Sequence, residues 1–238
     1  MHQLPPRFTD WFATKGWTVH PHQRDMLVRR DDPALLLIAP TGGGKTLAGF
    51  LPTLVDLSEK PQTGLHTLYV SPLKALAADI KRNLTTPVTE MDLPIRVEDR
   101  TGDTSAHVKK RQRADPPHIL LTTPESLALL ISYEDAPRIF KGLKRVVVDE
   151  IHALAESKRG DQLMLCLARL ARLSPQMTQR VADLLQEIAK RKIATLLVEQ
   201  KLAIAMDIAD RVYVMGHGEM QFEGTPAELK DREDVRKE

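Results

Sequence analysis

The chain has 238 residues, enough for one large domain or two small ones, and 42% of them are hydrophobic and 28% charged. A net charge of +2 excludes a strong overall attraction to nucleic acid or to a membrane surface. The charge is uneven, because residues 177–238 carry 12 acidic and 10 basic side chains. Any polyanionic partner is therefore expected to bind the earlier part of the chain.

Cysteine usage and apolar runs point to the cytoplasm. Cys166 is the only cysteine, so no disulfide can form within the chain, as is usual in a reducing cytosol. Residues 1–6 lack the basic and then apolar pattern of a signal peptide, and no run of 18 apolar residues can span a membrane. We therefore expect a cytoplasmic protein without a membrane partner.

The first predicted feature is a helix that opens near Pro21 and carries Gln23. An amide side chain both donates and accepts hydrogen bonds, so Gln23 can read the edge of an adenine base. The alternative is a glutamine on the exposed face of a helix. Taken alone, the residue favours this alternative.

A phosphate-binding turn is predicted over residues 39–46, which read Ala-Pro-Thr-Gly-Gly-Gly-Lys-Thr. The turn follows the apolar run 34–38, expected to be a buried strand, and precedes a helix over 47–60. Backbone amides of such a turn and the helix dipole hold phosphate groups. Lys45 can reach the β- and γ-phosphates, and the Thr46 hydroxyl can hold Mg²⁺. The residues expected to bind the nucleotide are Thr41, Gly42, Gly43, Gly44, Lys45 and Thr46.

Further strands and helices alternate along the chain. Strands are expected over 67–70, near 96–97, over 118–123 and over 144–148, with helices over 73–84, from Pro124 onward and over 161–173. The basic run 109–113 reads either as a solvated helix face or as a nucleic-acid patch. A hairpin over 212–222 and a charged helix over 226–238 end the chain. The fold class is therefore α/β, with a mainly parallel sheet covered by helices on both faces and a C-terminal β-hairpin.

Two acids, Asp149 and Glu150, directly follow the apolar strand predicted over 144–148. A carboxylate in the first position can hold Mg²⁺ or its bound water, and one in the second can accept a proton from an attacking water. The alternative is an Asp that caps a helix, followed by a Glu in its first turn. The presence of Lys45 and Thr46 earlier in the chain favours the Mg·ATP interpretation.

Residues 1 to about 175 resemble the first RecA-like lobe of a superfamily 2 DExH-box helicase of the ligase-associated, Lhr type. The resemblance rests on the Gln23 region, residues 39–46, 71–76, 101–104, 122–126, 149–152 and 158–160. It implies a three-layer P-loop NTPase fold, ATP binding by Gln23 and the phosphate loop, and weak contact with single-stranded DNA or RNA. The implied nucleic-acid contacts are Ser71, Pro72, Lys74, Thr101, Gly102, Thr123, Pro124 and Glu125.

Residues from about 177 to 238 resemble instead the C-terminal part of an ABC transporter ATPase of the branched-chain amino acid or urea type. The segments 196–200, 209–215 and 223–229 carry this resemblance. It implies that a strand over 194–198 completes the sheet and brings Gln200, at the switch position of that family, near the γ-phosphate. Residues 1–238 are therefore expected to form one P-loop domain, built from a 1–175 and a 176–238 segment.

The two resemblances together predict a fused or engineered chimera that binds Mg·ATP or ADP. Lys45, Glu150 and Gln200 are the expected catalytic residues. Hydrolysis should be slow, because we identify no second helicase lobe with an arginine finger, a group that contributes about 10³–10⁵ in rate. Autonomous unwinding is not expected. The alternatives are a nucleic-acid-dependent ATPase fragment, a non-enzymatic recombined fold and, more weakly, a transporter subunit.

Overall fold

The computed structural model describes residues 4–32, 35, 37, 44–150, 153, 157–173, 212–216 and 219–232. The chain divides into two compact units, Met1–Gln179 and Arg180–Glu238. Thr41, Gly42, Gly43, Gln200 and the strand predicted over 194–198 lie outside the described residues, as does most of the apolar run 34–38. Among the described residues, no helix is both long and apolar enough to cross a membrane.

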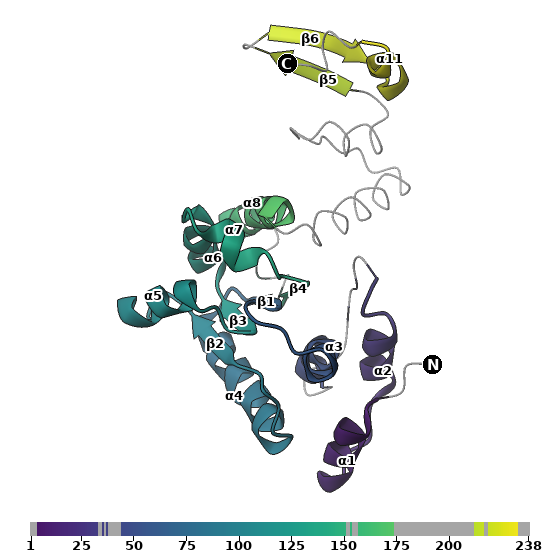
Figure 1. Cartoon of the computed structure of the whole chain (residues 1–238), viewed down its shortest axis with the longest axis vertical. Helices are drawn as coiled ribbons and strands as arrows, with labels where there is room; N and C mark the ends of the chain where they lie inside the picture. Colours follow the sequence, from purple (N-terminus) through teal and green to yellow (C-terminus); the bar gives the residue numbers. More distant parts are fainter. Residues whose placement is uncertain are drawn as a thin grey trace. The chain divides into compact units, whose positions relative to one another are not determined.

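In the described part of the first unit, four parallel strands form a sheet in the order β2-β3-β1-β4 (Figure 1). The carboxyl ends of all four strands are level, because Thr122 pairs with both Val70 and Arg100, and Val70 pairs with Val148. The strands predicted over 67–70, near 96–97, over 118–123 and over 144–148 are confirmed, with boundaries that differ by at most three residues. Their bounds are β1 Thr67–Val70, β2 Val97–Arg100, β3 Ile119–Thr122 and β4 Arg145–Val148.

Helices cover both faces of this sheet, as expected for a three-layer α/β fold (Figure 1). Side chains alternate between the faces of a strand. Tyr69 and Leu121 therefore point into a core with α1–α4, whereas Leu68 and Val70 point into a second core with α6–α8. The helices are α1 Pro6–Thr14, α2 Pro21–Val28, α3 Lys45–Glu59, α4 Lys74–Glu90, α6 Pro124–Ser132, α7 Ala136–Phe140 and α8 Lys158–Leu173.

Some boundaries differ from the sequence expectation. Helix α4 continues to Glu90 rather than ending at residue 84, since Leu84 and Val88 are buried in the first core. Helix α7 was not predicted, because its five residues are too few to show a helical period. The apolar strand predicted over 144–148, β4, is half-buried, because among the described strands it pairs only with β1, at the edge of the sheet.

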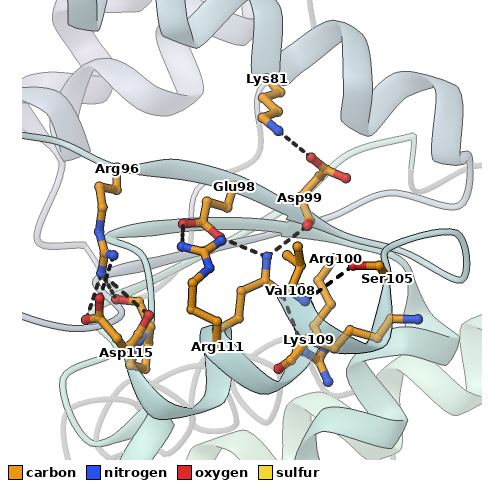
Figure 2. A network of polar contacts seen from close by, with 12 residues as sticks. Lys81, Arg96, Glu98, Asp99, Arg100, Ser105, Val108, Lys109, Arg111 and Asp115 are labelled. Atoms are coloured by element: carbon orange, nitrogen blue, oxygen red, sulfur yellow. Dashed lines mark hydrogen bonds and ion pairs between the residues drawn. The ribbon is translucent and has the colours of Figure 1, made fainter.

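The opposite edge strand, β2, is covered by helix α5 (Ala106–Ala114) (Figure 2). The buried Gln112 donates a hydrogen bond from Nε2 to the Asp99 carbonyl oxygen at 3.0 Å, so an edge carbonyl is satisfied. Arg111 makes a two-pronged ion pair with Glu98. Arg113 pairs with Asp135. Two members of the predicted basic run are thus paired with acids on neighbouring elements.

A polar cluster joins α3 to the amino ends of β1 and β4. Arg145 donates hydrogen bonds to Asp56 Oδ2 at 3.2 Å and to Thr53 Oγ1 at 3.0 Å. Arg30 pairs with the other oxygen of Asp56 at 3.5 Å. Thr53 and Thr67 share a buried hydroxyl–hydroxyl hydrogen bond of 2.9 Å. Asp56 therefore holds two cations at the end of the sheet opposite to the carboxyl ends of the strands.

The second unit contains the predicted hairpin, formed by β5 (Val212–Gly216) and β6 (Glu219–Gly224) in antiparallel pairing. Helix α11 (Pro226–Lys230) follows it. Thr225 caps this helix, and Glu228 accepts a hydrogen bond from the Thr225 amide in return, which is a capping box. The helix was predicted to run to residue 238, but residues 231–232 are no longer helical.

Candidate functional site

The candidate site lies at the carboxyl edge of the parallel sheet. Each strand ends directly before a predicted site residue: Ser71 follows β1, Thr101 follows β2, Thr123 follows β3 and Asp149 follows β4. Because the strands are parallel and end level with one another, these residues share one edge. Ligands of open α/β sheets bind beyond this edge. The acidic pair and the predicted nucleic-acid residues are therefore brought together.

Asp149 is held in place by three hydrogen bonds. The Tyr69 hydroxyl donates to Oδ2 at 2.7 Å, and the backbone N–H of Glu150 donates to Oδ1 at 2.9 Å. The Asp149 amide itself donates to the Val70 carbonyl oxygen at 3.0 Å and continues the sheet pairing. Burial and then the hydrogen bond to Asp149 raise the pKa of Tyr69 far above its ordinary value, so the phenol remains a donor.

Glu150 has a left-handed backbone conformation, with φ +52°. This conformation costs a non-glycine residue about 1–3 kcal/mol and is concentrated at functional sites. It also excludes Glu150 from the first turn of an α-helix, where φ is negative. The helix-cap alternative for the acidic pair is therefore wrong. The turn instead directs the Glu150 amide toward the carboxylate of Asp149.

The described end of the phosphate turn is fixed by Gln23. Gly44 has φ +72° and precedes Lys45 and Thr46 in the first turn of α3. A Cβ at Gly44 would lie 2.8 Å from Gln23 Nε2, which donates to the Gly44 carbonyl oxygen at 3.4 Å. Gln23 is buried, so the alternative of a glutamine on the exposed face of a helix is wrong. Its Oε1 accepts a hydrogen bond from the His20 amide. Hydrogen bonds at both ends therefore fix the orientation of the Gln23 amide group.

These groups fit a Mg·nucleotide. The site offers a glycine at which an added Cβ would displace the Gln23 amide, a Lys-Thr pair in the first turn of a 15-residue helix, and an oriented carboxylate. Carboxylate and hydroxyl oxygens are the ligand type that Mg²⁺ prefers. The donor set is therefore suitable for the cofactor that the sequence predicts.

The predicted nucleic-acid residues divide into a buried and an exposed group. Ser71, Pro72, Thr101, Thr123 and Pro124 are buried, whereas Lys74, Gly102 and Glu125 are exposed. The Thr101 amide donates to Thr104 Oγ1 at 3.0 Å, and Thr123 accepts a hydrogen bond from the Ser126 amide as the cap of α6. The buried residues thus shape the loops and caps, and the exposed ones can meet a ligand directly.

Lys74 connects two of these loops. Its Nζ pairs with Asp103 at 2.9 Å, and it lies 3.2 Å from the position that a Cβ at Gly102 would occupy. Lys109 of α5 donates to the Gly102 carbonyl oxygen at 3.0 Å. The loops after β1 and β2 are therefore in contact, and two lysine side chains lie at Gly102.

Arg159 of α8, to which the sequence assigned no role, joins the segments that follow β1 and β3. Its guanidinium pairs with the Glu125 carboxylate, and its Nη2 donates to the Pro72 carbonyl oxygen at 2.7 Å. The hydrogen bond from Arg159 holds the pKa of Glu125 below its ordinary value. The sequence also does not indicate that Tyr69 belongs to the site. The pattern of a buried strand does not show which group a side-chain hydroxyl near its end will contact, here Asp149.

Residues 20–182 match the family described as DEAD/DEAH box helicase. The chain belongs to this family. The ATP-dependent helicase Lhr-Core protein 2 of Thermococcus barophilus is 44% identical over 181 residues, which are 69% of this chain and 21% of that protein. Among solved structures, Mycobacterium smegmatis helicase Lhr bound to ssDNA and AMP-PNP has a TM-score of 0.66 and 40% identity. That match covers 73% of this chain and 23% of the other.

A second solved relative, the DUF1998 helicase MrfA bound to DNA and AMPPNP, has a TM-score of 0.65, 28% identity and coverage of 73% and 24%. The DEAD/DEAH box member described here therefore corresponds to the first RecA-like lobe of an Lhr-type helicase, and the expected fold class is confirmed. Helicases of this family use ATP and Mg²⁺. The chain matches only 12% to 21% of the length of the first three curated relatives. These similarities give no support to a transporter ATPase origin for residues 177–238.

Proposed function

We propose that the chain is the nucleotide-binding lobe of a nucleic-acid-dependent ATPase of the Lhr type. The observation that carries the proposal is the common carboxyl edge. The acidic pair directly follows β4, and the loops after β1, β2 and β3 begin at the same level of the sheet. A ligand on those loops lies next to the groups assigned to ATP. This arrangement favours the nucleic-acid-dependent interpretation over a fold without activity.

In this proposal Lys45 and the amides of the phosphate turn hold the phosphates, and Gln23 orients the adenine and the turn. Thr46 and Asp149 hold Mg²⁺, which neutralises phosphate charge when bound. Glu150 is the residue that orients a water and accepts its proton. Gln200, outside the described residues, remains a proposal as a third group near the γ-phosphate.

The nucleic-acid partner is proposed to be a single strand that crosses the loops at the carboxyl edge. The solved Lhr and MrfA relatives are bound to ssDNA or DNA together with a nucleotide analogue. In this chain, Lys74 and Lys109 supply positive charge beside Gly102, and the backbone there is exposed. Both lysines contact carbonyl or carboxylate oxygens that a phosphate oxygen can replace.

Turnover by the 238 residues alone is proposed to be slow. Arginine fingers contribute about 10³–10⁵ in rate in ATPases of this type, and none is assigned among the described residues. The relatives are several times longer than this chain. Unwinding is therefore proposed for the longer relatives and not for the 238 residues alone.

The C-terminal segment is a separate proposal. The division of the chain at Gln179 lies close to the boundary expected between the 1–175 and 176–238 segments, and the predicted hairpin and a capped helix follow. These observations describe a separate compact unit and do not bear on its origin, so a distinct origin for 176–238 stays a proposal. Whether it completes a single P-loop domain can be tested by calorimetry. One cooperative transition supports one domain, and two separate transitions contradict it.

Binding of a fluorescent ATP analogue with Mg²⁺ tests the main proposal. Lys45→Ala should weaken binding by about tenfold or more, because it removes a charge contact with phosphate. Lys60→Ala, at the other end of α3, is the matched control and should bind like the parent chain. ATP turnover should then rise on addition of single-stranded DNA or RNA. A folded parent chain that does not bind the analogue would contradict the proposal.

A further inference from the structure

Tyr69 is buried with only its hydroxyl at the site. It is the third residue of β1 and pairs in register with Val147 of β4. Its ring packs 5.7 Å from that of Phe50 in α3, and the residue is 1% exposed. A buried phenol needs a hydrogen-bond partner, and here that partner is Asp149 Oδ2 at 2.7 Å.

The two oxygens of Asp149 are held separately. Oδ2 accepts from the Tyr69 hydroxyl and Oδ1 from the Glu150 amide, so the carboxylate plane cannot rotate without losing a hydrogen bond. An ionised carboxylate has about four acceptor sites. Two of these sites are not taken by hydrogen bonds from the described residues and can accept a cation or its bound water. The contacts orient the carboxylate and leave it able to bind.

The two donors differ in origin. The Glu150 amide belongs to the turn that follows Asp149, so it moves with the acidic pair. Tyr69 belongs to the neighbouring strand and is fixed by the core that it shares with α3. The phenol is therefore the contact that places the carboxylate relative to the helix carrying Lys45 and Thr46.

We propose that Tyr69 is a positioning residue whose hydroxyl holds the Asp149 carboxylate in the orientation that binds the Mg²⁺ of a bound nucleotide. This inference rests on the proposed function, in which Asp149 is a Mg²⁺ ligand. Groups that orient a metal ligand in this way typically change metal affinity by about 10–100-fold when they are removed. A tyrosine that only fills the core would have no such effect.

Tyr69→Phe tests the inference because it keeps the ring against Phe50 and removes only the hydroxyl. The Mg²⁺ concentration that half-saturates binding of a fluorescent ATP analogue should rise by about tenfold. The affinity for the analogue in excess EDTA should not change, because the phosphate turn is untouched. Tyr133→Phe, which removes a phenol hydroxyl at the end of α6 rather than at Asp149, is the matched control and should have the Mg²⁺ requirement of the parent chain.

Asp149→Asn separates this inference from the proposed function. If the parent chain binds the analogue independently of Mg²⁺ and Asp149→Asn binds it equally well, the assignment of Asp149 as a Mg²⁺ ligand is overturned together with this inference. If the parent depends on Mg²⁺ but folded Tyr69→Phe has the same requirement, only the role of Tyr69 is overturned. In the Asp149→Asn background, Tyr69→Phe should cause no further change. An equal, additive change there would show that Tyr69 does not act through Asp149 and would overturn the inference.

Discussion

Arg159 of α8 pairs with the Glu125 carboxylate of α6 and donates a hydrogen bond to the carbonyl oxygen of Pro72 at 2.7 Å. A single guanidinium therefore holds together the loop after β1 and the first turn of the helix after β3. Both segments belong to the proposed nucleic-acid surface. The two side chains are 41% and 48% exposed, so their contact contributes little to global stability. We expect this contact instead to fix the loop after β1 relative to the first turn of α6.

Arg159→Ala should therefore weaken binding of single-stranded DNA while leaving nucleotide affinity unchanged. We expect a loss of about fivefold, the size typical of coupling through a contact outside the ligand site. Fluorescence anisotropy with a labelled oligonucleotide measures it. Arg82→Ala, which breaks an exposed pair with Asp79 on α4, is the control for loss of one positive charge. Equal losses in both variants would mean that only net charge matters.

The same ion pair should give a pH dependence. Arg159 lowers the pKa of Glu125 in the folded protein from its ordinary value of 4.5. A lowered carboxyl pKa stabilises the folded state above the ordinary value, and this contribution is lost as the pH falls from 4.5 through the lower folded value. Thermal melting at a series of pH values should show a smaller decline over this range for Glu125→Gln than for the parent. An identical decline would show that the pair has no linkage to folding.

The sequence predicted the strands and their end residues well, because apolar runs and glycine turns are local signals. It could not predict the contacts made at the strand ends. Tyr69 is indistinguishable from any apolar strand residue until its register opposite β4 brings the hydroxyl to Asp149. Arg159 likewise meets Glu125 across 34 residues of chain. Such contacts depend on the packing of whole elements, which no local pattern reports.

The burial of Gln23 and the backbone conformation of Glu150 could not be predicted from the sequence either, because both depend on contacts or geometry that no local pattern shows. Gln23 reads as a surface residue in its own helix, because no neighbour in the sequence marks it as buried. Its burial comes from the packing of α2 against α3, which brings its amide to Gly44. The left-handed conformation of Glu150 was also unexpected, since an acidic residue after a strand normally continues into a helix or turn with negative φ.

Gly44→Ala should weaken nucleotide binding, because the added Cβ would push the Gln23 amide away from the phosphate turn. The new Cβ would lie 2.8 Å from Gln23 Nε2, in addition to the strain of φ +72°. Gly64→Ala is a matched control, because Gly64 has φ +81° but no atom within 4 Å of the position that its Cβ would take. Both variants should lose about 1–2 kcal/mol of stability from backbone strain. Only Gly44→Ala should also weaken binding of the fluorescent ATP analogue, and equal binding by both variants would contradict a contact-based role for Gln23.

Asp56→Asn should destabilise the folded protein without changing its affinity for nucleotide. Asp56 holds Arg145 and Arg30 at the end of the sheet away from the site, and the three side chains are only 12–21% exposed. Asp56→Asn removes the negative charge that faces two partly buried guanidinium groups. The free energy of unfolding should fall by about 2–4 kcal/mol as a result. Chemical denaturation measures this loss. Asp79→Asn, which breaks a fully exposed pair, should cost less than about 1 kcal/mol. Because the Asp56 cluster lies at the amino ends of β1 and β4, folded Asp56→Asn should bind nucleotide with the affinity of the parent, and a weaker affinity would mean that the two ends of the sheet are coupled.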